Sequence, residues 1–307
     1  MASVLCVGHA VQDFVFAVDA LPAGGEKYRA HGFDSMGGGP AATAAVTIAR
    51  LDGAAFLAAR LGDDSIADLI VAELQSHGVD TQHMRRFAGC RSSLSAVMLD
   101  KAGERMIVNY LDPAMPTDAA WLPPPGTLGV AAVLADTRWP AGAAAALTLA
   151  KAAGLPAVLD ADRPLGPNSP LLAAASHIAF SAEGLADYAG HRDMARALAD
   201  VAAATGAWTC VTMGGEGVLV QQGTARAHVP AFRVQVVDTL GAGDVWHGAF
   251  ALALAEGERE LPAVRFANAA AALKAQRLGG RRGVPTRGEL TAFLSQHTQH
   301  TECGETA

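Results

Sequence analysis

The sequence lacks an excess of basic residues. Lys and Arg number 23 against 30 Asp and Glu, so the formal net charge of the 307-residue chain is −7 at pH 7. Nucleic-acid-binding proteins usually carry a basic face, and this balance therefore argues against a nucleic-acid partner. An anionic small molecule would need a local group of Lys or Arg side chains, because the overall field of the protein is negative.

Cysteine is scarce as well. The four cysteines, Cys6, Cys90, Cys210 and Cys303, form no Cys-x-x-Cys pair and show no zinc-type spacing. This pattern argues against a disulfide framework and favours reduced thiols in a cytoplasmic protein.

Long hydrophobic runs are also missing. We expect no membrane span, because no uninterrupted run of about 18 apolar residues occurs. The apolar start of the chain, residues 1–11, lacks the basic flank of a signal peptide and is interpreted as a buried strand. Hydrophobic residues nevertheless make up 51% of the chain, which is enough apolar material for a large core.

Short apolar runs alternate with longer, Ala-rich segments over most of the chain. The short runs predict strands at residues 3–7, 54–59, 130–135, 157–160, 177–180 and 209–212. The segments between them predict helices, among them 41–51, 64–77 and 141–153, and residues 248–278 predict two more. Strands that alternate with helices predict an α/β fold with a doubly wound, mostly parallel sheet covered by helices on both faces.

Four further segments predict a small β-sheet outside this core. Residues 13–18 and 27–33 alternate loosely, and residues 94–99 and 105–110 flank a turn-rich tetrapeptide that is typical of a hairpin. We expect one domain over residues 1–297, with lid strands drawn from about 11–36 and 92–112. Residues 298–307 form a polar tail.

The most informative segment is Asp-Thr-Leu-Gly-Ala-Gly-Asp at 238–244, which precedes a predicted helix at 245–255. Its glycines allow the backbone to approach a phosphate, and the start of a helix offers N–H groups and a favourable dipole. A carboxylate at Asp244 could then accept the proton of an attacking hydroxyl. The residues alone leave a second interpretation open, in which Asp244 is a helix cap after a glycine turn.

This segment resembles the C-terminal signature of the PfkB (ribokinase-like) sugar kinase family. The family's other marks follow in order: Gly-Gly at 38–39, Gly-Asp-Asp at 62–64 and Thr-Met-Gly-Gly-Glu-Gly at 212–217. The resemblance covers roughly residues 4–295 and implies a doubly wound α/β domain with a β-sheet lid. It also implies transfer of phosphate from ATP, with Mg²⁺, to a sugar hydroxyl, and a homodimer formed through the lids.

The resemblance also implies roles for single residues. At the transferred phosphate it places Asp244 as the base, with an anion hole from Gly241, Ala242 and Gly243. Around the nucleotide it places Thr212, Gly214, Gly217 and Gly279. At the sugar it places Asp13, Gly38, Gly39 and Thr43. His9 and His247 lie near these motifs but receive no catalytic role.

The sequence departs from the family's pattern at two places. Thr43 stands where the family usually has an Asn that touches the sugar, which implies a different sugar pose. The Asn-x-x-Glu motif near the metal is replaced by Ser-Ala-Glu-Gly at 181–184, so Glu183 could supply the carboxylate instead. The resemblance further suggests a monovalent cation such as K⁺, held by carbonyls around Asp238 and the loop at 279–283.

Within the family, several segments resemble the sulfofructose kinases, which phosphorylate 6-deoxy-6-sulfofructose at O1 in sulfoquinovose breakdown. These segments lie at 37–45, 103–105, 109–110, 134–139 and 279–281. The resemblance implies that Lys27, Asn109 and Arg138 hold the sulfonate. A point cation, a neutral donor and a forked guanidinium suit the three oxygens of a tetrahedral anion.

Two alternatives stay open at this point. The chain could be a kinase for another ketose or ketose phosphate, such as fructose, fructose 6-phosphate or tagatose 6-phosphate, because two cations also suit a phosphate. It could also be a sugar-binding pseudokinase without activity, although the presence of Asp244 with its glycines argues against that.

Overall fold

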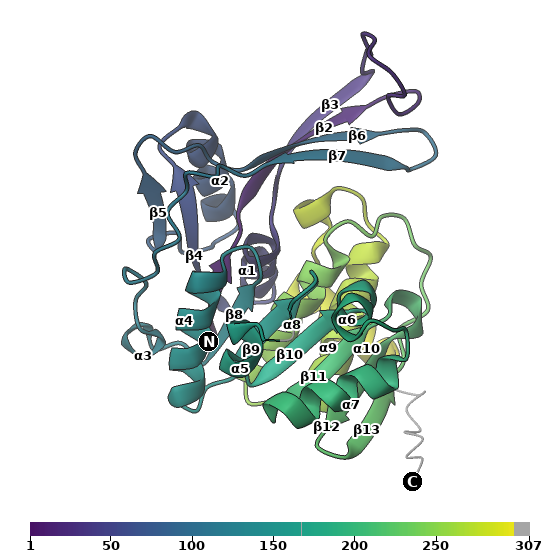
Figure 1. The fold of residues 1–307 in the computed structure, drawn as a ribbon. Coiled ribbons are helices and arrows are strands. Elements are labelled where there is room, and N and C mark those ends of the chain that lie inside the picture. Colours follow the sequence, from purple (N-terminus) through teal and green to yellow (C-terminus); the bar gives the residue numbers. More distant parts are fainter. Residues whose placement is uncertain (167, 298–307) are drawn as a thin grey trace.

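The computed structural model describes residues 1–166 and 168–297 (Figure 1). The predicted polar tail at 298–307 lies outside the described residues. No helix within the described part of the chain is both long and apolar enough to span a bilayer.

A large sheet forms the centre of the molecule, and the predicted doubly wound α/β fold is confirmed. Its strands within the described residues follow the order β13-β12-β11-β10-β9-β8-β1-β4-β5. All neighbours are parallel except for the antiparallel pairs β11–β12 and β12–β13. The strands are β1 (Ser3–Gly8), β4 (Ala54–Gly62), β5 (Met84–Phe87), β8 (Ala132–Asp136), β9 (Ala157–Ala161), β10 (His177–Ser181), β11 (Trp208–Thr212), β12 (Val218–Gln222) and β13 (Ala225–Val229).

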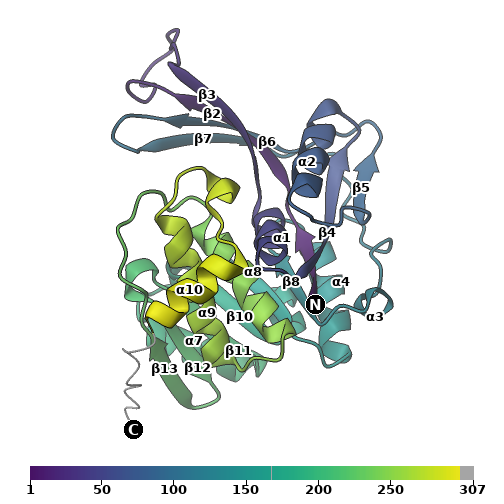
Figure 2. The same ribbon diagram turned by 180° about the vertical axis from the view of Figure 1, so that it is seen from behind.

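Helices cover both faces of this sheet, as Figures 1 and 2 show from opposite sides. One face carries α1 (Pro40–Arg50), α2 (Ser65–Ser76), α8 (Ala242–Ala255), α9 (Glu260–Ala275) and α10 (Arg287–Gln296). The other carries α3 (Pro125–Leu128), α4 (Pro140–Ala152), α5 (Pro170–Ala174), α6 (Ala182–Ala189) and α7 (Met194–Thr205).

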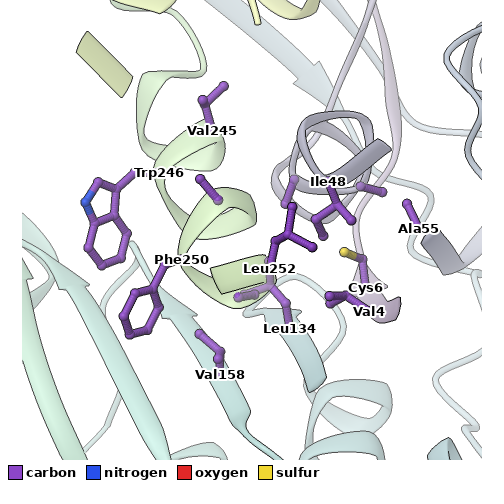
Figure 3. Close-up of a cluster of buried hydrophobic side chains, with 14 of the residues drawn as sticks. Val4, Cys6, Ile48, Ala55, Leu134, Val158, Val245, Trp246, Phe250 and Leu252 are labelled. Atoms are coloured by element: carbon purple, nitrogen blue, oxygen red, sulfur yellow. The ribbon is translucent and has the colours of Figure 1, made fainter. Parts of the chain in front are cut away.

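The alternation of side chains along each strand divides the core into two clusters. In β1, Val4 and Cys6 belong to the cluster under α1 and α8, whereas Leu5 and Val7 belong to the cluster under α4. Figure 3 shows part of the first cluster, where Leu252 of α8 and Ile48 of α1 meet above the sheet. Both faces of the strand are buried, which explains why the strand appeared in the sequence as one continuous apolar run.

A second sheet projects from the edge of the main body (Figure 1). Its strands, in the order β3-β2-β6-β7, are β2 (Val11–Ala17), β3 (Gly32–Gly38), β6 (Leu94–Leu99) and β7 (Arg105–Tyr110). We call this four-stranded sheet the lid. The strands β6 and β7 coincide with the predicted hairpin.

The lid strand β3 differs from the sequence-based prediction. A strand was predicted at 27–33, but β3 begins at Gly32 and continues through Gly37 and Gly38, which were interpreted as a turn. A Cβ atom at Gly38 would collide with the carboxylate of Asp13 on β2, and one at Gly37 would collide with Arg281. These glycines therefore serve the close approach of neighbouring groups within a strand.

The helices α1 and α8 pack closely because Gly248 has no side chain. A Cβ atom at Gly248 would lie 2.6 Å from the carbonyl oxygen of Ala44. Both helices begin at motifs that the sequence singled out, Gly38-Gly39 and Gly241–Asp244. The close packing therefore fixes the distance between the two motifs.

We expect Gly248→Ala to lower the free energy of unfolding by about 1–3 kcal/mol, because the added methyl group would push the two helix backbones apart. Urea unfolding followed by circular dichroism measures the change. The matched control is Gly288→Ala in α10, where a Cβ atom meets nothing within 4 Å. That control should be neutral or stabilising by up to about 1 kcal/mol. Equal stabilities for the two variants would contradict the packing argument.

Candidate active site

A cavity of about 550 Å³ opens beside the start of α8. Five residues that line the cavity were predicted from the sequence to contact the nucleotide or the phosphate: Thr212, Gly214, Gly217, Ala242 and Gly243. Apolar side chains such as Val218, Phe232 and Trp246 form much of the remaining wall. The structure therefore brings two motifs 25 or more positions apart in the sequence to one cavity whose walls suit a flat, apolar base.

The start of α8 supplies the polar end of this cavity. The helix begins at Ala242, three residues earlier than predicted, because its N-cap Gly241 adopts a left-handed conformation with φ of 74°. Gly243 and Asp244 thus lie in the first helical turn, where N–H groups have no partner inside the helix. The N–H of Ala242 donates to the carbonyl of Thr239, so an anion would rely more on Gly243, which is exposed and lines the cavity.

The carboxyl of Asp244 lies in an unusual electrostatic environment. Burial raises its pKa from 3.8 to about 7, and the nearby carboxylate of Asp160 acts in the same direction. His247 and Arg138 partly oppose this rise in pKa. A carboxyl with a pKa near neutrality is suited to accept and release a proton at physiological pH.

A buried polar pair lies beneath Asp244. The Nδ1 atom of His247 lies 2.8 Å from the carbonyl oxygen of Gly243, and its Nε2 atom lies 3.5 Å from Oδ1 of Asp160. His247 therefore packs under the helix, as the sequence suggested. The sequence analysis missed Asp160, although a carboxylate at the end of an otherwise apolar strand was a usable signal.

Several residues predicted to contact the sugar meet around Arg281. Arg281 is buried and donates to the hydroxyl of Thr43, to the carbonyl of Gly38 and to the carboxylate of Glu73. Thr43, which replaces the family's usual Asn, thus accepts a hydrogen bond from Arg281 at 3.2 Å. Burial raises the pKa of the neighbouring Asp13 carboxyl, although the Ser95 hydroxyl and the charge of Arg281 act against it.

Asp136 organises the ends of three elements at this site. Its carboxylate accepts hydrogen bonds from the backbone N–H groups of His9 at 2.8 Å, Ala41 at 3.1 Å and Arg138 at 2.8 Å. The helix α1 begins with Gly39 at the N-cap and has no side-chain cap of its own, so Asp136 supplies an acceptor for its first turn. Gly39 has φ of 95° and lies against the backbone of His9.

The three residues predicted to hold a sulfonate have different environments. The guanidinium of Arg138 forms a two-pronged ion pair with Asp162. Asn109 on β7 donates to the hydroxyl of Ser95 at 3.1 Å and to the carbonyl of Leu94 at 3.2 Å. Lys27 is exposed in the segment between β2 and β3, and no contact joins it to Arg138 or Asn109 within the described residues.

A second cavity of about 250 Å³ lies next to Arg138. Three arginines, Arg60, Arg91 and Arg138, line it together with His9 and Ser93. Its one acidic lining residue, Asp112, already accepts hydrogen bonds from the backbone N–H groups of residues 91 and 114. The cavity therefore carries positive charge that the sequence analysis had assigned only in part, through Arg138.

Two further predicted site residues, Gly279 and Glu183, do not line the nucleotide cavity. The N–H of Gly279 donates to the carboxylate of Asp238 at 3.3 Å. Glu183 is exposed on α6. Within the described residues no three His, Cys, Asp or Glu side chains are grouped to hold a metal ion. These residues do not form a protein-built Mg²⁺ site, so Glu183 as a ligand stays a prediction.

This arrangement is that of a small-molecule kinase, with a carboxylate between a nucleotide-sized cavity and polar groups under a lid. A sequence profile described as "pfkB family carbohydrate kinase" matches residues 1–287. The chain therefore belongs to the PfkB family of carbohydrate kinases and is an ATP-dependent sugar kinase.

Several proteins are similar over their whole length. The ribokinase of Bacillus subtilis is 28% identical over 96% of this chain and 100% of its own. The ATP-dependent ribose-1-phosphate kinase of Halopiger xanaduensis is 30% identical over 96% and 99%. A crystal structure from Agrobacterium tumefaciens, provisionally named a ribokinase, has a TM-score of 0.91 and 36% identity over 98% and 99%. The structure of Arabidopsis thaliana ribokinase with ribose and ATP has a TM-score of 0.84 and 25% identity over 95% and 98%.

We expect Asp244→Asn to lower kcat by about 10²–10⁴-fold while leaving nucleotide binding nearly intact, because the amide cannot accept a proton. In the unchanged enzyme, kcat/KM should rise with pH through about 7, where the carboxyl ionises. Steady-state kinetics from pH 5 to 9 and calorimetry with ATP measure both effects.

The same variant should also be more stable above neutral pH. The folded protein binds the Asp244 proton more tightly than the unfolded chain, so ionisation reduces stability as pH rises from about 4 to about 7. Asn removes this penalty, and the melting temperature should exceed that of the wild type at pH 8 but not at pH 4. Wild-type turnover in the variant would disprove the assignment of the base.

Proposed function

We propose that this kinase phosphorylates the O1 hydroxyl of a ketose whose far end carries an anion, with 6-deoxy-6-sulfofructose as the favoured substrate. The observation that carries the proposal is the arginine-lined cavity beside Arg138. Arg138 already pairs with Asp162, whereas no ion pair joins Arg60 or Arg91 to a carboxylate within the described residues. A neutral sugar would leave these two guanidinium groups without an anionic partner, which is costly when the site closes and water leaves.

The position of the cavity supports this substrate. Arg138 follows β8 and is close enough for its charge to lower the pKa of Asp244. A sugar with its O1 at Asp244 would therefore extend its other end toward Arg138 and Arg91. Ser93, which also lines the cavity, lies 3.5 Å from the Nδ2 atom of Asn109 and connects this neutral donor to the same place.

The ion pair of Arg138 sets a condition for binding. Asp162 already accepts from both terminal nitrogens of Arg138, so a sulfonate would have to share or displace this carboxylate. Arg60 is held by the carbonyl of Pro116 at 2.9 Å and lies over the ring of Trp139. Arg60 is thus fixed in place, and Arg138 is the group whose partner would change when substrate binds.

In the proposed reaction the sugar hydroxyl attacks the terminal phosphorus of ATP. Asp244 accepts the hydroxyl proton, the new O–P bond forms, and the bond to the leaving ADP oxygen breaks. The N–H of Gly243 and the dipole of α8 stabilise the developing negative charge. Mg²⁺, held mainly by the phosphates, would neutralise further charge there.

A second candidate is a phosphorylated sugar such as fructose 6-phosphate or ribose 1-phosphate. The Halopiger relative is named for an anionic sugar, which also suits an arginine-lined cavity. A phosphate monoester carries a charge of about −1.5 to −2 at pH 7 against one for a sulfonate. Charge alone would therefore discriminate only partly between the two.

We expect Arg138→Ala to lower kcat/KM for 6-deoxy-6-sulfofructose by a factor that corresponds to about 2–5 kcal/mol of binding free energy. Arg138→Lys should recover only part of this loss, because an ammonium lacks the planar, forked donors that match two oxygens of one anion. Values for fructose should change far less in both variants. The measurement is kcat/KM for a panel of 6-deoxy-6-sulfofructose, fructose 6-phosphate, ribose 1-phosphate, fructose and ribose.

The matched control is Arg196→Ala, since Arg196 is an exposed arginine on α7 with only a surface ion pair to Asp200. It should leave the whole panel unchanged. A clear preference of the wild type for fructose or ribose would disprove an anionic substrate. A preference for a sugar phosphate would disprove the sulfofructose assignment but not the proposal of an anionic substrate.

We further propose that the outer face of the lid pairs with the lid of a second copy of the chain. The strand register places Asp13, Ser95 and Asn109 on the face toward the active site. The opposite face is apolar and carries Phe14, Phe16, Phe33, Ala96, Met98, Met106 and Val108. Phe33 is 62% exposed and Val108 60% exposed, and such a patch is typical of a protein interface.

We expect a wild-type mass of twice the 31.4 kDa of one chain by light scattering. Val108→Asp should reduce the mass to that of a monomer, because it would bury a charge between the two lids. Ile107→Asp is the control, since Ile107 is 55% exposed on the same strand but points to the other face. A monomeric wild type, or a dimeric Val108→Asp variant, would contradict the proposal.

A further inference from the structure

A lysine lies fully buried beneath the start of the phosphate-binding segment. Lys274 is in the last turn of α9, and its side chain is 0% exposed. Its aliphatic stem packs against the loop that follows α9, where a Cβ atom at Gly283 would lie 2.9 Å from the lysine Cδ atom. The enzyme therefore keeps a long cationic side chain in its interior, next to the active site but outside the cavities described above.

Three oxygen atoms surround the ammonium group of Lys274. Nζ lies 3.1 Å from the carbonyl oxygen of Asp238, 3.3 Å from its carboxylate and 3.2 Å from the carbonyl oxygen of Arg277. An ammonium has three N–H donors, and each of them finds an acceptor. The group also lies at the C-terminal end of α9, where the helix dipole favours a positive charge.

One of these oxygens, the Asp238 carbonyl, belongs to the group that the sequence suggested for a monovalent cation, and the Arg277 carbonyl lies just before the suggested loop. That prediction used carbonyls around Asp238 and the loop at 279–283. In the structure the ammonium of Lys274 already faces the Asp238 oxygens, and the N–H of Gly279 donates to the Asp238 carboxylate at 3.3 Å. The residues present do not fit an exchangeable K⁺, because the place is filled by a charge that belongs to the chain.

Two of the oxygens that accept from Lys274 belong to Asp238, the first residue of the predicted phosphate-binding segment at 238–244. Asp238 accepts through its carboxylate from the N–H of Leu240 at 2.9 Å, and the carbonyl of Thr239 accepts from the N–H of Ala242 at 3.1 Å. The N–H groups of Val237 and Asp238 are tied to the carbonyl of Ala275 on α9. A shift of Asp238 would therefore move the turn that places Gly243 and Asp244.

The lid is joined to the same carboxylate. Arg105 on β7 donates to the Asp238 carboxylate at 2.9 Å. Two cations, one buried and one from the lid, thus share one acid, and together with the N–H of Leu240 they outweigh the effect of burial and keep the Asp238 pKa below its ordinary value.

We propose that the ammonium of Lys274 is a built-in replacement for a monovalent cation, which positions residues 238–243 for phosphate binding and makes the kinase independent of K⁺. Lys274 does not touch substrate and acts as a positioning residue through Asp238. The proposal rests on the sugar kinase activity of the family and not on the identity of the sugar.

The test compares the wild type with Lys274→Ala in KCl, NaCl and choline chloride at equal ionic strength of about 0.1 M. The wild type should show the same kcat in all three salts within about twofold. Lys274→Ala opens space between the same oxygens. It should be slower by about 10- to 100-fold in choline chloride and should regain activity with saturable dependence on K⁺.

Two further variants sharpen the result. Lys274→Met keeps the stem but lacks the charge, so it should be slow and should not respond to K⁺. Lys151→Ala is the matched control, since the Lys151 ammonium also donates to two carbonyls, those of Ala173 and Ala175 at 3.0 Å, far from the active site. It should behave as the wild type in every salt.

Affinity for MgATP, measured by calorimetry in the same salts, gives a second readout that needs no sugar. If Lys274→Ala does not fold, Lys274→Gln takes its place in both measurements. Activation of the wild type by K⁺ of more than about fivefold would overturn the proposal. A folded Lys274→Ala enzyme that is equally slow in all three salts would overturn it too, because the lysine would then be only a structural support. Absence of turnover on sulfofructose would leave this test unaffected, since any sugar that is turned over serves.

Discussion

The close packing of α1 on α8 is the constraint on which the active site depends. It requires a residue without a side chain at Gly248, and it places the first turns of the two helices side by side. A Cβ atom at Gly241 would lie 3.6 Å from the side chain of Thr43, so the sugar motif and the phosphate motif are in near contact. In the proposed reaction neither motif alone forms a site, because one supplies contacts to the sugar and the other supplies the base.

Several carboxylates lie close together around this contact, and ionisation of Asp244 among them lowers the stability of the fold. Asp136, Asp160, Asp162 and Asp244 lie at or near the carboxyl ends of neighbouring strands or at the start of α8, where ligands of open α/β sheets gather. Burial and the charges of Asp160 and Asp162 raise the pKa of Asp244 and favour its protonated form, whereas His247 and Arg138 favour its ionised form. Because substrate would change the partner of Arg138, binding at the far end of the sugar would also change the basicity of Asp244.

A second network connects the lid to the phosphate-binding turn through Asp238. Lys274 holds this acid from below, and Arg105 reaches it from the lid. Arg282 forms a further ion pair with Asp34 on β3. These ion pairs therefore join the lid to the segment before α8 and to the loop at 279–283, although the regions are distant in the sequence.

The sequence by itself determined the class of fold, most of its strands and helices, and the family. Buried strands appear in the sequence as short apolar runs, and the glycine-rich segment at 238–244 predicted the start of a helix. There Gly241 adopts φ of 74°, a conformation that favours glycine. The tertiary structure alone decided the partners of the charged residues. Arg281 meets Thr43 across 238 positions, Arg138 is paired with Asp162, and Lys274 takes the place expected for an ion. Such pairings depend on which loops meet after the sheet has formed, and no local pattern of residues encodes that.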